Sequence, residues 1–141
     1  METIAWSDAL ILGVPELDRE HEALITHFQT LADPALMQDQ DTFRERLDAL
    51  VAEVCAHFDH EERMMREHHY PDAAAHKEAH DGLLKQINSF LTLLEQEHGD
   101  PGVTIVDFAG QWLVDHISED DCLFRDFLQR RRAGVEKAGM A

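Results

Sequence analysis

The chain has 141 residues, in which 29 aspartates and glutamates outnumber 12 lysines and arginines and give a formal net charge of −17. This length fits one domain with a single core, and the negative charge disfavours nucleic acid or an anionic membrane surface as a partner. No apolar stretch near the N-terminus is long enough for a signal peptide or a membrane span, so we expect a cytoplasmic protein without a membrane partner.

Residues 1–15 are predicted to form an N-terminal arm. They contain Trp6 and a short apolar run but no helical period. A helix-start signal follows at Pro15–Asp18, and the apolar spacing predicts a first helix from about residue 16 to residue 32. His21 lies among the apolar positions of this helix, so we expect it to face the interior.

Two further helices are predicted at about residues 41–70 and 72–97, because apolar residues recur at helical spacing and Pro71 separates the two stretches. The apolar stripes of these helices carry four possible metal donors: His57, Glu61, His76 and His80. Glu62, which follows one of these donors directly, is expected to face water.

A turn at residues 99–102 precedes a fourth predicted helix, from Val103 to about Arg131, with His116 among its apolar positions. The segment 134–141 is predicted to be a flexible tail. Because no stretch alternates like a β-strand and the loops are short, the sequence predicts an all-α, up-down-up-down four-helix bundle over residues 16–133.

The spacing of the donors predicts a dinuclear metal site. Four residues advance about 400° along an α-helix, so the donor pairs of the second and third helices each project from one face. Five imidazoles with two carboxylates suit a pair of divalent ions, and iron is the best match. The second carboxylate is either Asp120 or Asp121. A regular helix places Asp120 about 40° and Asp121 about 140° from His116.

Other metal-dependent classes fit less well. Ferritin-like bundles use two Glu-x-x-His motifs, whereas the chain has only the pair Glu95 and His98. The His-Glu-x-x-His motif of zinc peptidases is absent, because Met64 stands four positions after His60. Five histidines fall off the donor stripes or near helix ends and are expected at the surface: His27, His60, His68, His69 and His98.

Taken together, these motifs resemble the hemerythrin family over nearly the whole chain. The residues that carry the resemblance are Trp6, Gly13-Val14 and Asp18 before His21, His57-Phe58, Glu61-Glu62, Met65, Tyr70-Pro71, His76 to His80, and Trp112-Leu113 before His116-Ile117. The resemblance implies two irons, the first held by His76, His80 and His116 and the second by His21 and His57. It also implies bridging by Glu61, Asp121 and a solvent-derived oxo or hydroxo group.

By the same resemblance, the second iron keeps an open position at which O2 binds. An apolar lining around this position is expected from Leu24, Phe58, Trp112, Leu113 and Ile117. The family often has a tyrosine three positions after the bridging aspartate, and this chain has Phe124 there. The implied hydroxyl near the bridge is therefore missing.

The function expected from this resemblance is reversible O2 binding for storage, delivery or sensing, without enzymatic turnover. One alternative is a di-iron enzyme such as a peroxidase, an oxidase or a nitric-oxide scavenger. A weaker alternative is a purely structural metal, such as zinc. The sequence does not predict an oligomeric state.

Overall fold

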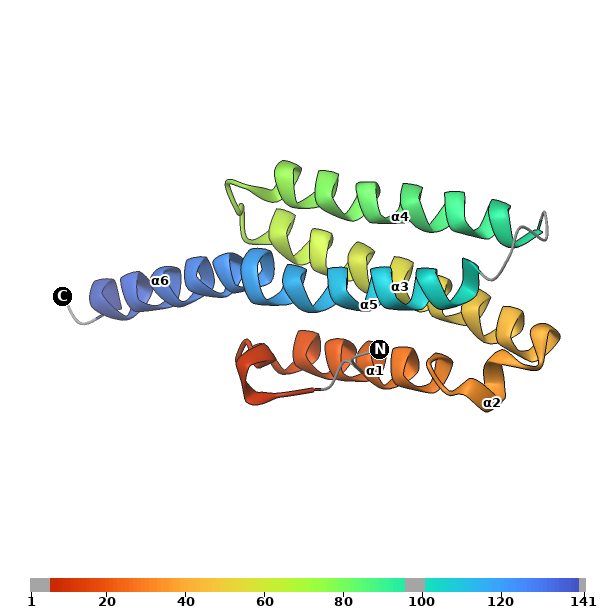
Figure 1. Cartoon of the computed structure of the whole chain (residues 1–141). Helices are drawn as coiled ribbons and strands as arrows, with labels where there is room; N and C mark the ends of the chain where they lie inside the picture. The colour runs from red at the N-terminus through yellow and green to blue at the C-terminus, as the bar shows by residue number, and fades with distance from the viewer. Residues whose placement is uncertain (1–5, 96–100, 140–141) are drawn as a thin grey trace.

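The computed structural model describes residues 6–95 and 101–139, and every regular element in these ranges is helical. The main helices lie side by side in Figure 1: α1 (Pro15–Leu31), α3 (Gln40–Glu67), α4 (Ala73–Glu95) and α5 (Pro101–His116). Helix α1 contacts α3, α3 contacts α4, α4 contacts α5, and α5 contacts α1 again, which closes the bundle. The predicted all-α four-helix bundle is confirmed.

The core of the bundle consists of apolar side chains that recur at helical spacing on each long helix. Those with less than 2% exposure include Leu17, Leu24, Ile25, Leu31, Phe58, Met65, Ile117 and Phe124. Each side chain of this size contributes about 1.5–3 kcal/mol when it is removed from water. Among the described helices, none is both long enough and apolar enough to cross a membrane.

The N-terminal arm lies against the start of α1 and contains a short 3-10 helix, η1 (Asp8–Leu10). The Asp18 carboxylate accepts hydrogen bonds from the backbone N–H groups of Leu12, at 2.8 Å, and Gly13, at 3.1 Å. Gly13 has a φ of 80°, a left-handed conformation that favours glycine. Side-chain hydrogen bonding by the first turn of α1 therefore fixes the path of the arm.

Two local features at the ends of α1 and α3 differ from the sequence predictions. A one-turn helix, α2 (Pro34–Met37), lies between the first and second predicted helices, where no helix was predicted. Helix α3 ends before the predicted proline boundary, because His69 adopts a left-handed φ of 55°. The N–H of Tyr70 then donates to the Met65 carbonyl at 2.9 Å, and the N–H of His69 donates to the Arg66 carbonyl at 3.1 Å. This is a Schellman motif, which is usually formed with glycine.

The fourth helix of the bundle is longer and less regular than predicted. Helix α5 continues through a π-helical turn, η2 (Ile117–Asp121), into α6 (Cys122–Gly139), which extends beyond the neighbouring helices in Figure 1. The N–H of Cys122 donates to the Ile117 carbonyl, five residues earlier. The helix was predicted to end near Arg131 and instead continues to Gly139. Of the predicted turn at 99–102, residues 99 and 100 lie outside the described residues, and α5 begins at Pro101.

Candidate metal centre

All seven predicted donors converge in the interior of the bundle. They come from α1, α3, α4, α5 and the π-helical turn, and each is buried: His21, His57, Glu61, His76, His80, His116 and Asp121. Their ligand atoms form two groups, in each of which the atoms lie within 4.8 Å of one another. Both carboxylates belong to both groups.

The first group contains three imidazoles. Glu61 Oε1 lies 2.5 Å from His76 Nε2 and 3.3 Å from His80 Nε2. Asp121 Oδ1 lies 2.9 Å from His76 Nε2 and 3.3 Å from His116 Nε2. The Nε2 atoms of His80 and His116 are only 2.9 Å apart. Since a neutral imidazole has one donor and one acceptor nitrogen, three nitrogens directed at one point suit a shared cation better than hydrogen bonds alone.

The second group contains two imidazoles and the remaining oxygen of each carboxylate. Asp121 Oδ2 lies 3.1 Å from His21 Nε2. Glu61 Oε2 lies 3.3 Å from His57 Nε2 and 3.6 Å from His21 Nε2. Each carboxylate thus presents one oxygen to each group, which is the arrangement needed to bridge two cations.

Several buried polar atoms in this centre lack hydrogen bonds among the described residues. They are both ring nitrogens of His21, Glu61 Oε2 and both carboxylate oxygens of Asp121. A buried polar atom without a partner costs about 1–3 kcal/mol, and more when the group is charged. Two metal ions, one in each group of ligand atoms, would satisfy four of these five atoms, all except His21 Nδ1. The donor set therefore fits a pair of metal ions.

The electrostatics of the centre also favour cations. Burial alone would raise the pKa of Glu61, but the nearby imidazoles of His116, His21 and the other donor histidines outweigh burial and lower this pKa well below its usual value. Burial opposes protonation of His57, yet its hydrogen bond to Glu20 and the nearby Glu61 carboxylate raise its pKa to about 9. The centre therefore attracts positive charge, and protons occupy it when no metal does.

The π-helical turn determines which aspartate enters the centre. A π turn closes on the fifth residue instead of the fourth, so Asp121 reaches the face that Asp120 would occupy in a regular helix. Asp120 instead accepts a hydrogen bond from His116 Nδ1 at 2.8 Å. The regular-helix angles, which place Asp120 closer than Asp121 to the direction of His116, therefore do not apply at this turn.

Comparison with known proteins assigns the chain to one family. The model of the hemerythrin HHE cation binding domain matches residues 12–130. The chain belongs to the hemerythrin family. It is 30% identical to the bacteriohemerythrin of Methylococcus capsulatus, over 88% of this chain and 95% of that protein. It is 29% identical to the bacteriohemerythrin of Stenotrophomonas maltophilia, over 89% of this chain and 82% of that protein.

One further relative and one solved structure also match most of the chain. The myohemerythrin of Theromyzon tessulatum is 27% identical over 88% of this chain and 92% of its own length. A crystal structure of a mutant protein superposes with a TM-score of 0.81 and 28% identity, covering 89% of this chain and 97% of that chain. The hemerythrin match thus extends over most of the sequence, and a solved structure shares the fold.

In this hemerythrin domain, carboxylates also hold the outer nitrogens of three donor imidazoles. Glu20 Oε1 lies 2.7 Å from His57 Nδ1, and Glu62 Oε2 lies 2.9 Å from His80 Nδ1. Asp120 does the same for His116, as described above. Such partners fix the tautomer and orientation of a metal-binding imidazole, so that Nε2 faces the metal.

The sequence did not reveal two of these partners. The prediction that Glu62 faces water is wrong, because it is only 8% exposed and contacts His80 on α4. Helical phase alone places this residue about 100° from Glu61, and only the packing of α4 against α3 shows that this side is covered. Glu20 could have been noticed as an acidic neighbour of His21, but its partner lies on a different helix.

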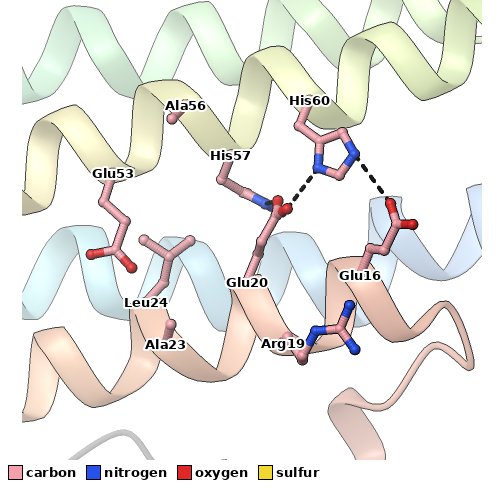
Figure 2. A pocket seen from close by; sticks show the side chains of 9 residues that line it. All are labelled: Glu16, Arg19, Glu20, Ala23, Leu24, Glu53, Ala56, His57 and His60. Carbon is pink, nitrogen blue, oxygen red and sulfur yellow. Dashed lines mark hydrogen bonds and ion pairs between the residues drawn. The ribbon is translucent and has the colours of Figure 1, made fainter.

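The Glu20 carboxylate binds two histidines at the edge of a cavity of about 430 Å³ between α1 and α3. Its second oxygen lies 2.6 Å from His60 Nδ1, and His60 Nε2 lies 3.4 Å from Glu16 Oε2 (Figure 2). His60, expected at the surface, is thus half-buried and paired. Burial opposes ionisation of Glu20, but hydrogen bonds from His57 and His60 lower its pKa overall.

The five residues expected to form an apolar lining occupy two kinds of position. Phe58 stacks on His80 with ring centroids 3.7 Å apart, and Trp112 stacks on His116 at 4.4 Å. The other three side chains, Leu24, Leu113 and Ile117, are buried. Leu24 also lines the cavity beside His57. The two aromatic rings therefore support imidazoles of the three-histidine group.

Among the histidines that were expected at the surface, His27 also pairs with a carboxylate: its Nδ1 lies 2.8 Å from Glu53 Oε2.

Proposed function

We propose that this hemerythrin domain binds O2 reversibly at a di-iron centre formed by the seven converging donors. The observation that carries the proposal is the asymmetry of the two groups around shared carboxylates. The first group offers three imidazoles and two oxygens, whereas the second offers two imidazoles and two oxygens. The ion in the second group has one protein ligand fewer, which leaves room for a small exogenous ligand.

The two groups support one ligand assignment. His76, His80 and His116 would hold one iron, His21 and His57 would hold the other, and Glu61 and Asp121 would bridge both with a solvent-derived oxo or hydroxo group. When bound, the iron pair supplies the electrons that reversible O2 binding requires. The protein supplies imidazoles whose orientation is fixed by the carboxylates at their outer nitrogens. It also supplies a buried environment that excludes water.

The same geometry favours a binding protein over an enzyme. Of the seven donors, only His57 lines the cavity between α1 and α3. The Nδ1 atom of this imidazole is occupied by Glu20, and its Nε2 atom faces the interior. An organic substrate in this cavity would meet Glu20 and Leu24 instead of the metal, so we propose that the centre accepts O2 and other small ligands only.

Iron analysis and visible spectroscopy test the proposal. We expect two irons per chain, and an absorption band that forms when air is added to the anaerobically reduced protein and disappears on evacuation. Glu61→Ala should abolish iron binding, whereas Asp59→Ala, a change of the same type at an exposed position on α3, should retain it. One iron per chain, or multiple turnover of an organic substrate without an oxygenated form, would overturn the proposal.

A further inference from the structure

A second cavity, of about 490 Å³, lies away from the metal centre, where the arm meets α1 and both meet α3 and α6. None of the seven donors lines it. Its walls include five apolar side chains from four parts of the chain: Leu12, Val14, Pro15, Met64 and Leu128. Its volume falls within the range of small-molecule sites, about 300–1,000 Å³.

The charge of this cavity is opposite to that of the chain. Acidic residues outnumber basic ones 29 to 12 in the sequence, yet the described residues that line the cavity include Arg125, Arg131 and Arg132 and no aspartate or glutamate. Clustered guanidinium groups next to an apolar wall give this cavity a local positive charge within a negative molecule, and local positive charge attracts an anion.

The three arginines differ in how many donors they have left. Arg125 forms an ion pair with Asp126 at 3.1 Å. Arg131 donates a hydrogen bond from Nη1 to the backbone carbonyl of His68, and this bond anchors its side chain at the cavity. The other N–H groups of its guanidinium remain available to a ligand. Arg132 is exposed and forms no hydrogen bond or ion pair with the described part of the chain. Arg131 and Arg132 therefore have donors available for a ligand.

We propose that this cavity binds an organic carboxylate with an apolar chain, such as an alkyl carboxylate. A guanidinium group matches a carboxylate with two parallel, charge-assisted hydrogen bonds, which a cation cannot accept and which are weaker with a neutral acceptor. The apolar wall formed by Leu12, Met64 and Leu128 receives the alkyl chain and removes it from water, at about 0.8 kcal/mol for each buried CH₂ group.

Calorimetric titration of the full chain with octanoate tests the proposal. We expect saturable binding, and at least tenfold weaker binding in the double variant R131Q/R132Q. The matched control is Arg130→Gln, which removes an exposed arginine of the same helix that does not line the cavity and should change the affinity less than twofold. Both substituted positions in the double variant are exposed, so the bundle should fold normally.

Two further ligands separate the contributions of the head group and the chain. Octanol keeps the apolar chain without the charge, and acetate keeps the carboxylate without the chain. Each should bind at least tenfold more weakly than octanoate. Equal binding of octanol, unchanged octanoate affinity in the double variant, or no octanoate binding would each overturn the proposal.

Discussion

Removal of the metal should make the stability of the protein depend strongly on pH between about 6.5 and 10. In the metal-free chain, nearby carboxylates hold protons on two of the donor imidazoles, and they raise the pKa of His57 to about 9 and that of His76 to about 10. For His76, burial opposes protonation, and the nearby Asp121 and Glu61 carboxylates outweigh burial. A raised pKa stabilises the folded state below the unfolded value of 6.5, and this contribution is lost as the pH rises through the folded value.

The expected size follows from these values. Each tenfold change in proton affinity corresponds to about 1.4 kcal/mol, so the rise from 6.5 to about 9 at His57 corresponds to about 3 kcal/mol. The contribution of His76 does not simply add, because both imidazoles contact Glu61. For a chain of 141 residues, a loss of about 3 kcal/mol lowers the Tm by about 10 °C.

Thermal unfolding followed by circular dichroism at pH 6.5, 8 and 9.5 measures this effect. The metal-loaded protein is the control, because metal replaces the protons while the net charge of the rest of the chain still changes with pH. We expect the Tm of the metal-free protein to fall by about 10 °C more than that of the metal-loaded protein. A metal-free Tm that stays constant or rises over this range would refute the assignment of protons to these imidazoles.

Three substitutions test other parts of the structure. Glu20→Ala should weaken metal binding about 10–100-fold, because His57 loses its outer partner, and exposed Glu22→Ala should not; a chelator competition assay measures both. Glu62→Ala should lower the Tm and the metal affinity through His80, with exposed Arg63→Ala as the control, and equal effects would contradict the burial of Glu62. His69→Gly should raise the free energy of unfolding in urea by about 0.5–1 kcal/mol, since glycine adopts the left-handed φ without strain; a destabilised variant would argue against this helix end.

The helical phase of the sequence was sufficient to predict the fold and the inward direction of most donors. His57 with Glu61, and His76 with His80, share helix faces that the bundle buries. These predictions succeed because a regular α-helix converts spacing directly into direction.

Features that depend on irregular backbone or on contacts between helices could not be predicted in this way. Regular geometry favoured Asp120, and the π-helical turn that brings Asp121 inward leaves no simple mark in the spacing. Glu20 and Glu62 acquire their roles only because His57 and His80 on neighbouring helices face them. The left-handed His69 likewise occupies a position at which glycine would be expected.

The single extra residue in the π-helical turn has a consequence for the whole C-terminal part of the chain. It allows two consecutive aspartates to serve opposite nitrogens of one imidazole, with Asp120 at His116 Nδ1 and Asp121 facing His116 Nε2. It also sets the rotation of every residue of α6, including buried Phe124, whose ring lies 5.0 Å from that of Tyr70. Shortening the turn by one residue would change the rotation of α6 by about 100°. The chain therefore cannot alter the length of this turn at the metal centre without also repacking its last helix.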